Sequence, residues 1–246
     1  MPGVEKRTEG PKPFRELPIT WVALSELKPH EALNEEELKG FIESVTRSGV
    51  FWLPLLITKK EKIILDGHHR WAGLRKLGAR RAPGILIDYE DPEINLGIWF
   101  PLLTKEIGIF LAALENNDIK TQIVPERQLA LNAVQSGNAK MAIVGKTKEE
   151  AILVLDDPLA VDILTKEEGE SICYIDTESA ALSEVDRGEA RFAIIRKPLT
   201  KADVRQKTDI GEVFAAKSTR HILPWAYQKI EVKLEEIIPN FHLDEE

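Results

Sequence analysis

Apolar residues recur with helical spacing between positions 35 and 48. Four of them fall on one helical face, at i, i+3, i+4 and i+7: Leu38, Phe41, Ile42 and Val45. Asn34 comes just before this run and Glu37 three residues later, which is typical of a helix N-cap with a capping box. Gly49 ends the run. The pattern predicts a helix after Asn34 with one buried face.

Short apolar runs on either side of one polar string predict strands. The runs cover residues 19–24, 54–58, 62–65 and 85–87. The third leads directly into Asp66-Gly67-His68-His69-Arg70, which we call the box. A helix with Trp71, Leu74 and Leu77 on one face should follow and end at Gly78. The sequence up to about residue 100 is therefore predicted to form a small α/β unit.

The second half of the chain contains two similar segments, 130–144 and 181–195. Ala, Leu, Val, Gly, Ala, Ala and Ile recur in step, and each segment predicts a helix, a glycine stop and a strand. We interpret this as an internal duplication, although helix–glycine–strand is also a common arrangement. The predicted fold class is α/β, of the α+β type, with a first domain at 1–104, whose residues 1–15 form a loose tail, and a second α/β domain at 105–246.

Composition narrows the class of protein. Hydrophobic residues make up 43% and charged residues 30%, which is typical of a chain with a substantial core. The net charge of −8 argues against a nucleic-acid partner. The single cysteine, Cys173, and the lack of a signal-like or membrane-length apolar run favour a cytoplasmic protein with no membrane partner. Many Glu and Lys residues with little Cys and Met indicate a thermophile.

The box has the residue types of a phosphate site. A strand ends, Gly67 permits a tight turn, and the start of a helix attracts anions. His68, His69 and Arg70 add hydrogen-bond donors, and Asp66 could hold a divalent cation such as Mg²⁺. Alternatively, Asp66 only caps the helix and one histidine is structural.

Other candidates lie outside the box. Glu31, in Lys28-Pro29-His30-Glu31, could act as a base, and Glu37 is a second carboxylate whose alternative is the capping box. Trp99, in Trp99-Phe100-Pro101, could wall a pocket between domains or belong to the core. Thr219, Arg220 and His221 could supply phosphate donors from the second domain or form a surface cluster.

The string Leu65–Leu74, which contains the box, resembles the phosphate-binding box of the ParB/sulfiredoxin superfamily. The sequence is most similar to the archaeal free serine kinases of that superfamily, from about residue 19 to 235, except at roughly 105–185. The matching segments are Lys28–Glu31, Glu43–Gly49, Asp66–Leu74, Trp99–Pro101 and Thr219–Pro224.

This resemblance implies transfer of phosphate from ADP or ATP to free L-serine, giving O-phospho-L-serine for cysteine biosynthesis. It implies Glu31 as the base, the box with Thr219, Arg220 and His221 at the phosphates, and Asp66 at magnesium. Trp99, Glu37 and His221 would bind serine, in a cleft between the two domains. The expected partners are serine and an adenine nucleotide, with the protein a monomer or small homo-oligomer.

Three other classes share some of these features. A ParB-like, nucleotide-dependent DNA-binding switch should carry a helix-turn-helix and a basic surface after the box, and neither is evident. A sulfiredoxin-type reductase needs a cysteine in the box, where this chain has His68 and His69. A non-catalytic nucleotide or amino-acid sensor differs from the kinase only in turnover.

Overall fold

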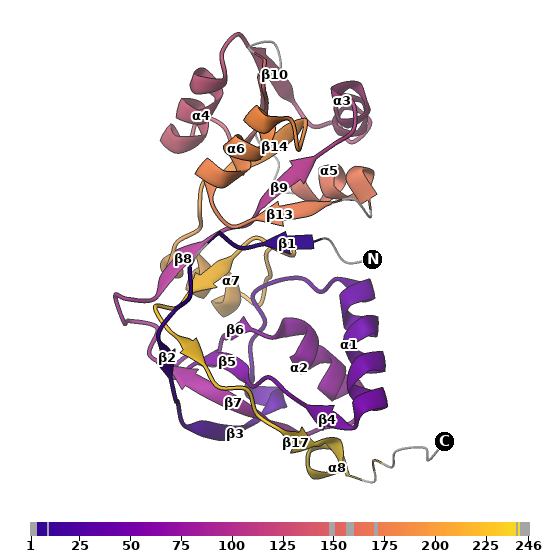
Figure 1. Ribbon diagram of the computed structural model, residues 1–246, viewed down its shortest axis with the longest axis vertical. Coiled ribbons are helices and arrows are strands. Elements are labelled where there is room, and N and C mark those ends of the chain that lie inside the picture. Colours follow the sequence, from indigo (N-terminus) through magenta and orange to yellow (C-terminus); the bar gives the residue numbers. More distant parts are fainter. Residues whose placement is uncertain are drawn as a thin grey trace. The chain divides into compact units, whose positions relative to one another are not determined.

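The computed structural model describes the chain as two compact units (Figure 1). The described residues are 4–8, 10–147, 151–155, 160–169, 172–239 and 241. Unit 1 consists of Met1–Gly10, Gly97–Leu199 and Lys217–Arg220, and unit 2 consists of Pro11–Leu96, Thr200–Ala216 and His221–Glu246. The short strands β8 (Asn95–Gly97) and β15 (Arg220–Ile222) lie where the chain passes from one unit to the other.

Unit 1 is built on a seven-stranded sheet with the order β1-β13-β9-β14-β11-β12-β10. The strands are β1 (Val4–Lys6), β9 (Phe100–Leu103), β10 (Thr121–Val124), β11 (Met141–Gly145), β12 (Ala151–Val154), β13 (Cys173–Ile175) and β14 (Phe192–Arg196). The strand β1 pairs with β13 in parallel, whereas the other recorded pairs of this sheet are antiparallel.

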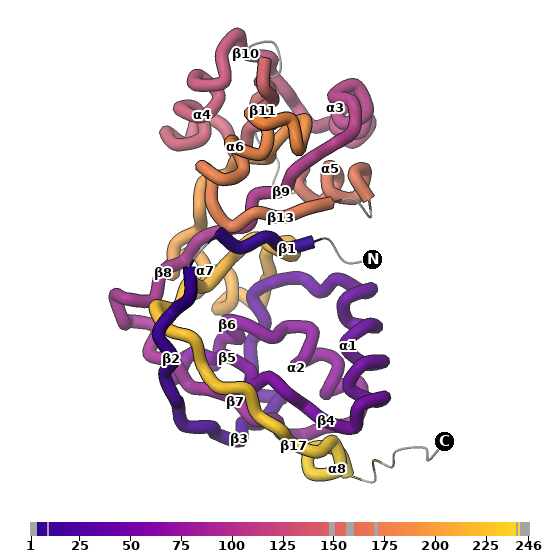
Figure 2. The backbone as a smooth tube through the Cα atoms, in the orientation of Figure 1, coloured from indigo at the N-terminus to yellow at the C-terminus, as the bar shows by residue number. Residues whose placement is uncertain are grey.

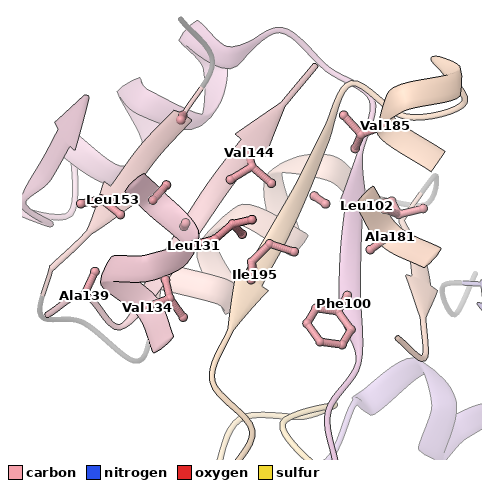
Figure 3. Packing of buried hydrophobic residues seen from close by; sticks show 14 of the residues in the cluster. Phe100, Leu102, Leu131, Val134, Ala139, Val144, Leu153, Ala181, Val185 and Ile195 are labelled. Carbon is pink, nitrogen blue, oxygen red and sulfur yellow. The ribbon is translucent and has the colours of Figure 1, made fainter. Parts of the chain in front are cut away.

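Helices cover both faces of this sheet. On one face, α4 (Arg127–Ser136) and α6 (Glu178–Arg187) bury Leu131 and Val185 against strand residues such as Leu102 (Figure 3). On the other face, α3 (Ile107–Glu115) and α5 (Ala160–Glu168) pack against Leu103 and its neighbours. Successive strand side chains point to opposite faces, so near-continuous apolar strands fill two cores.

The predicted repetition is confirmed and extends beyond the two predicted segments. The units β9-α3-β10-α4-β11 and β12-α5-β13-α6-β14 have the same order of elements, and β12 begins at Ala151, 51 residues after Phe100. The central strands β11 and β14 pair antiparallel with Ile143 opposite Ile194, which are equivalent positions of the two copies. Each copy's first strand pairs with the other copy's last strand, so the two copies share one sheet. The duplication therefore forms unit 1 as two interlocked copies around one sheet.

Unit 2 contains a four-stranded sheet with the order β3-β7-β5-β6. Its strands are β3 (Ile19–Ala23), β5 (Leu55–Thr58), β6 (Ile64–Asp66) and β7 (Arg81–Ile87), and the 3₁₀ turn Leu24–Glu26 follows β3. Two further pairs join distant segments: β2 (Phe14–Arg15) with β16 (Ala226–Tyr227), and β4 (Val50–Phe51) with β17 (Val232–Lys233). The helices are α1 (Glu35–Ser48), α2 (His68–Lys76), α7 (Lys201–Asp209) and α8 (Leu234–Ile237).

The C-terminal chain completes the two cores of unit 2, which lie on opposite faces of the sheet. In one core, α1 and α2 pack with Leu234 and Ile237 of α8. In the other, Leu223 and Trp225 pack with Val204 of α7. This C-terminal segment is the yellow tube that runs along unit 2 to β17 and α8 in Figure 2.

The division into units differs from the predicted boundary at residue 104. Residues 200–216 and 221–246 belong to unit 2 because their apolar side chains pack there, and that packing joins segments far apart in sequence. The segment 1–15, expected as a loose tail, contains the paired strands β1 and β2, while residues 1–3 and 9 lie outside the described chain. No helix among the described residues is both long and apolar enough to cross a membrane.

Candidate functional site

The box forms the predicted strand–glycine–helix turn. Strand β6 ends at Asp66, and Gly67 has φ 100°, a conformation that other residues rarely adopt. A Cβ at Gly67 would lie 2.9 Å from both Arg70 Nε and Leu55 Cδ2. Helix α2 then starts at His68 without a side-chain cap. The backbone N–H groups of this first turn make a favourable place for an anion.

Asp66 is held by two partners. Arg70 Nη2 donates to Asp66 Oδ2 at 2.5 Å, and Tyr227 Oη donates to the same oxygen at 3.2 Å. Desolvation by neighbouring residues tends to raise the pKa of the Asp66 carboxylate, which is nonetheless exposed. The charge and hydrogen bond of Arg70 outweigh this effect and lower the pKa of Asp66 to about 2. Arg70 also donates to the carbonyls of Leu53 and Pro54 at 3.0 and 2.6 Å. Asp66 is therefore ionised and fixed in orientation at neutral pH.

His69 links the box to the start of α1. Its Nε2 accepts a hydrogen bond from the Asn34 backbone N–H at 2.9 Å, and its Nδ1 lies 3.1 Å from Glu37 Oε2. Asn34 caps α1 as predicted, with its side chain accepting from the N–H groups of Glu36 and Glu37. The structure thus brings two predicted site residues, His69 and Glu37, into direct contact.

Three histidines from separate segments form a group inside unit 2. The ring of His30 lies 4.6 Å from that of His68 and 5.3 Å from that of His221. The His30 backbone N–H donates to His68 Nε2 at 3.3 Å, and Tyr89 Oη lies 2.8 Å from His221 Nε2. The group therefore joins the loop of Glu31, the box and the segment after Arg220.

These histidines are neutral at neutral pH. Burial lowers the pKa of His30 to about 4, despite its hydrogen bond to the Ile64 carbonyl. Burial and the neighbouring His30 lower the pKa of His221 to about 3, and the pKa of His68 lies well below its usual value for the same reasons. Any contact that they make with a phosphate would be a neutral hydrogen bond, so cationic charge must come from arginine, lysine or a metal.

The backbone around Glu31 is fixed by a parallel bridge to Phe214. The Phe214 N–H donates to the His30 carbonyl, and the Ala32 N–H donates to the Phe214 carbonyl, both at 2.8 Å. Glu31 itself is half-buried, next to the fully buried His30. The backbone that carries Glu31 is therefore restrained, which favours the fixed placement that a general base requires.

The remaining predicted residues, Trp99, Thr219 and Arg220, are buried in unit 1. Arg220 Nη2 lies 3.3 Å from Asp176 Oδ2, and its guanidinium lies over the Trp99 ring, 5.3 Å from the centroid. The structure thus groups Trp99 with Arg220 in unit 1. It groups Glu37 with His69, and His68 with His221, in unit 2.

Sequence patterns did not identify four partners of these residues: Tyr89, Tyr227, Asp176 and His30. Each contacts a candidate residue from a distant segment, such as Tyr227 with Asp66 across 161 positions. Only His30 had a local signal, since it precedes Glu31 in the same short motif.

The residues fit a magnesium ion held through a single carboxylate. No cluster of three or more His, Cys, Asp or Glu side chains suited to a metal occurs among the described residues. Magnesium bound to a nucleotide, however, commonly takes one or two carboxylates together with phosphate oxygens and water. Asp66 is exposed and ionised, and its Oδ2 accepts both of its recorded hydrogen bonds, which suits it to such a role.

Comparison with known proteins places this arrangement in a family, although no protein-family model matches the chain. The chain is 35% identical to an ADP-dependent L-serine kinase from Thermococcus kodakarensis, over 96% of this chain and 99% of that protein. It is 28% identical to an ATP-dependent L-serine kinase from Staphylothermus marinus, over 87% of this chain and 88% of that one.

A solved structure shows the same relationship in three dimensions. A free serine kinase in complex with AMP superimposes with a TM-score of 0.87 at 35% identity, covering 96% of this chain and all of that chain. The α/β fold prediction is therefore confirmed. Because the likeness spans nearly the full length of both chains, in sequence and in structure, this chain belongs to the L-serine kinase family.

Proposed function

We propose that the protein is a phosphotransferase that moves the terminal phosphate of ADP or ATP to the hydroxyl of free L-serine, giving O-phospho-L-serine. The near full-length likeness to an ADP-dependent L-serine kinase carries the proposal. The DNA-switch and sensor alternatives have no comparable support, since the two curated relatives described above match most of the chain and are kinases.

Glu31 is the base in this proposal. It accepts the proton of the serine hydroxyl as that oxygen forms a bond to phosphorus, while the bond to the leaving AMP or ADP oxygen breaks. The restrained loop described above supports this role, because a base must be held within hydrogen-bond reach of its substrate.

The box contributes charge and position. The α2 N-terminus would receive phosphate oxygens, with His68 and His69 beside it. Asp66 would hold Mg²⁺, which when bound neutralises phosphate charge. Arg70 would also fix Asp66, because it donates to that carboxylate and is itself held by its hydrogen bonds to the Leu53 and Pro54 carbonyls.

Trp99, Thr219, Arg220, His221 and Glu37 complete the proposed set. Arg220 and Thr219 would bind phosphate, while Trp99, His221 and Glu37 would recognise serine. Arg220 supplies the permanent charge that the neutral histidines lack. The product would feed cysteine biosynthesis. The relatives divide between ADP and ATP, so the donor remains one of these two.

The test compares wild type with Glu31→Gln, using Glu36→Gln as the matched control because Glu36 is exposed at the start of α1. Each protein receives L-serine, Mg²⁺ and either ADP or ATP, with phosphoserine measured by mass spectrometry. We expect product from wild type and the control. Glu31→Gln should lose about 100-fold or more in kcat with nucleotide affinity nearly unchanged. Equal rates in Glu31→Gln and wild type would remove Glu31 as the base.

A further inference from the structure

The N-terminal strand brings two residues to the surroundings of Trp99 and Arg220. Strand β1 lies beside β13 (Figure 1) and pairs with it in parallel, with Val4 opposite Cys173 and Lys6 opposite Ile175. Arg7 and Thr8 follow β1, just as Asp176 follows β13. Because parallel strands end at the same edge of a sheet, this register places Thr8 next to Asp176.

Thr8 makes three hydrogen bonds to the Asp176 carboxylate. Its backbone N–H donates to Oδ1 and Oδ2 at 3.0 and 2.9 Å, and its hydroxyl donates to Oδ1 at 2.7 Å. The same carboxylate pairs with Arg220 through Oδ2 at 3.3 Å. The Asp176 side chain is fully buried and that of Arg220 is 8% exposed. A buried carboxylate needs such donors, so Thr8 and Arg220 share the stabilisation of one charge.

Further contacts tie the same segment to this group. The guanidinium of Arg7 lies over the Trp99 ring at 5.8 Å from its centroid, in addition to that of Arg220. Glu5 forms an ion pair with Lys217, three residues before Arg220. Strand β1 and the residues after it therefore contact Trp99, Asp176 and the chain that leads to Arg220.

We propose that Thr8, acting through Asp176, is a positioning residue for Arg220 in the phosphoryl transfer. This inference rests on the proposed kinase function. With Thr8 in place, the Asp176 charge is shared among the Thr8 N–H, the Thr8 hydroxyl and Arg220, and these contacts together set the position of the Arg220 guanidinium. If the Thr8 hydroxyl is lost, the Asp176 carboxylate has one donor fewer and attracts the Arg220 guanidinium more strongly. The guanidinium then shifts away from the geometry that binds phosphate.

The test uses Thr8→Val, which keeps the shape and the backbone donor but removes the hydroxyl, and Thr8→Ser, which restores a hydroxyl. Asp186→Asn is the matched control, because it breaks an exposed ion pair with Arg127 in the same unit. Thr8→Val should lower kcat/KM about tenfold, as expected for a lost hydrogen bond to a charged group. Thr8→Ser and Asp186→Asn should stay within about twofold of wild type.

A double-mutant cycle separates positioning from general stability. In an Arg220→Gln background, Thr8→Val should have almost no further effect on kcat/KM, because the residue through which it acts is gone. Should Arg220→Gln not fold, as judged by circular dichroism, Arg220→Lys replaces it, and the Thr8→Val effect should still shrink. The inference is overturned by an unchanged kcat/KM in Thr8→Val or by an equal loss in both backgrounds. Absence of phosphoserine from wild type would instead overturn the kinase function itself.

Discussion

Acidification should destabilise unit 2 in a way that traces to its buried histidines. His30 and His221 have folded-state pKa values of about 4 and about 3, against 6.5 when exposed. As the pH falls below 6.5, the unfolded chain binds protons at these sites and the folded chain does not. Stability present above pH 6.5 is therefore lost progressively until the pH reaches the folded-state pKa values.

The size of this effect follows from proton linkage. Each histidine that is protonated only when unfolded lowers the free energy of unfolding by about 1.4 kcal/mol per pH unit below 6.5. Between about pH 7.5 and 5.5, His30 and His221 together should remove roughly 3 kcal/mol. His68 shifts in the same direction and adds to the loss.

Urea denaturation at about pH 7.5 and 5.5, followed by tryptophan fluorescence, measures the loss. Four of the five tryptophans, Trp21, Trp52, Trp71 and Trp225, belong to unit 2, so the signal reports mainly on that unit. His221→Gln removes one titrating site and should reduce the loss by about 1.4 kcal/mol. Equal stability at both pH values, or an undiminished loss in His221→Gln, would refute the reasoning.

Two further substitutions test the packing of each unit. In unit 2, Gly73→Ala should lower the free energy of unfolding, measured by urea denaturation, by about 1–3 kcal/mol, because the new Cβ would lie 2.4 Å from Phe41 Cδ1. Gly40→Ala should instead raise it by roughly 0.5–1 kcal/mol, because a Cβ there meets no neighbouring atom within 4 Å and alanine favours the helix α1. Similar costs for both glycines would contradict the close approach of α1 and α2. In unit 1, Ile143→Val and Ile194→Val should each lower the free energy of unfolding by about 0.5–1.5 kcal/mol, because the two positions are equivalent and fully buried. Clearly different losses would argue against equivalent packing.

Local sequence patterns predicted the elements whose signals lie within a few residues. The cap at Asn34, the helical face from Leu38 to Val45, and the strand–Gly67–helix turn all occur as expected. The duplication was also visible in the sequence, because equivalent positions of the two copies face the same core and are apolar in both, such as Val134 with Val185 and Ile143 with Ile194.

Features that depend on distant contacts were not predictable. The C-terminal strand β17 pairs with β4 some 180 positions earlier, so the unit boundaries could not be predicted from local patterns. Likewise, β1 and β2 are strands only because they pair with the distant strands β13 and β16. The same applies to the site. Asp66 was a candidate on local grounds, but its partner Tyr227 and the Asp176 partner of Arg220 carry no sequence signal of their own.

This chain is expected to make O-phospho-L-serine. Phosphorus NMR of the purified, folded protein with L-serine, Mg²⁺ and ADP, and separately with ATP, tests it most directly. We expect a phosphoserine resonance to grow with one of these donors, in step with AMP formed from ADP or ADP formed from ATP. No phosphoserine with either donor, or nucleotide breakdown that yields only inorganic phosphate, would contradict the account.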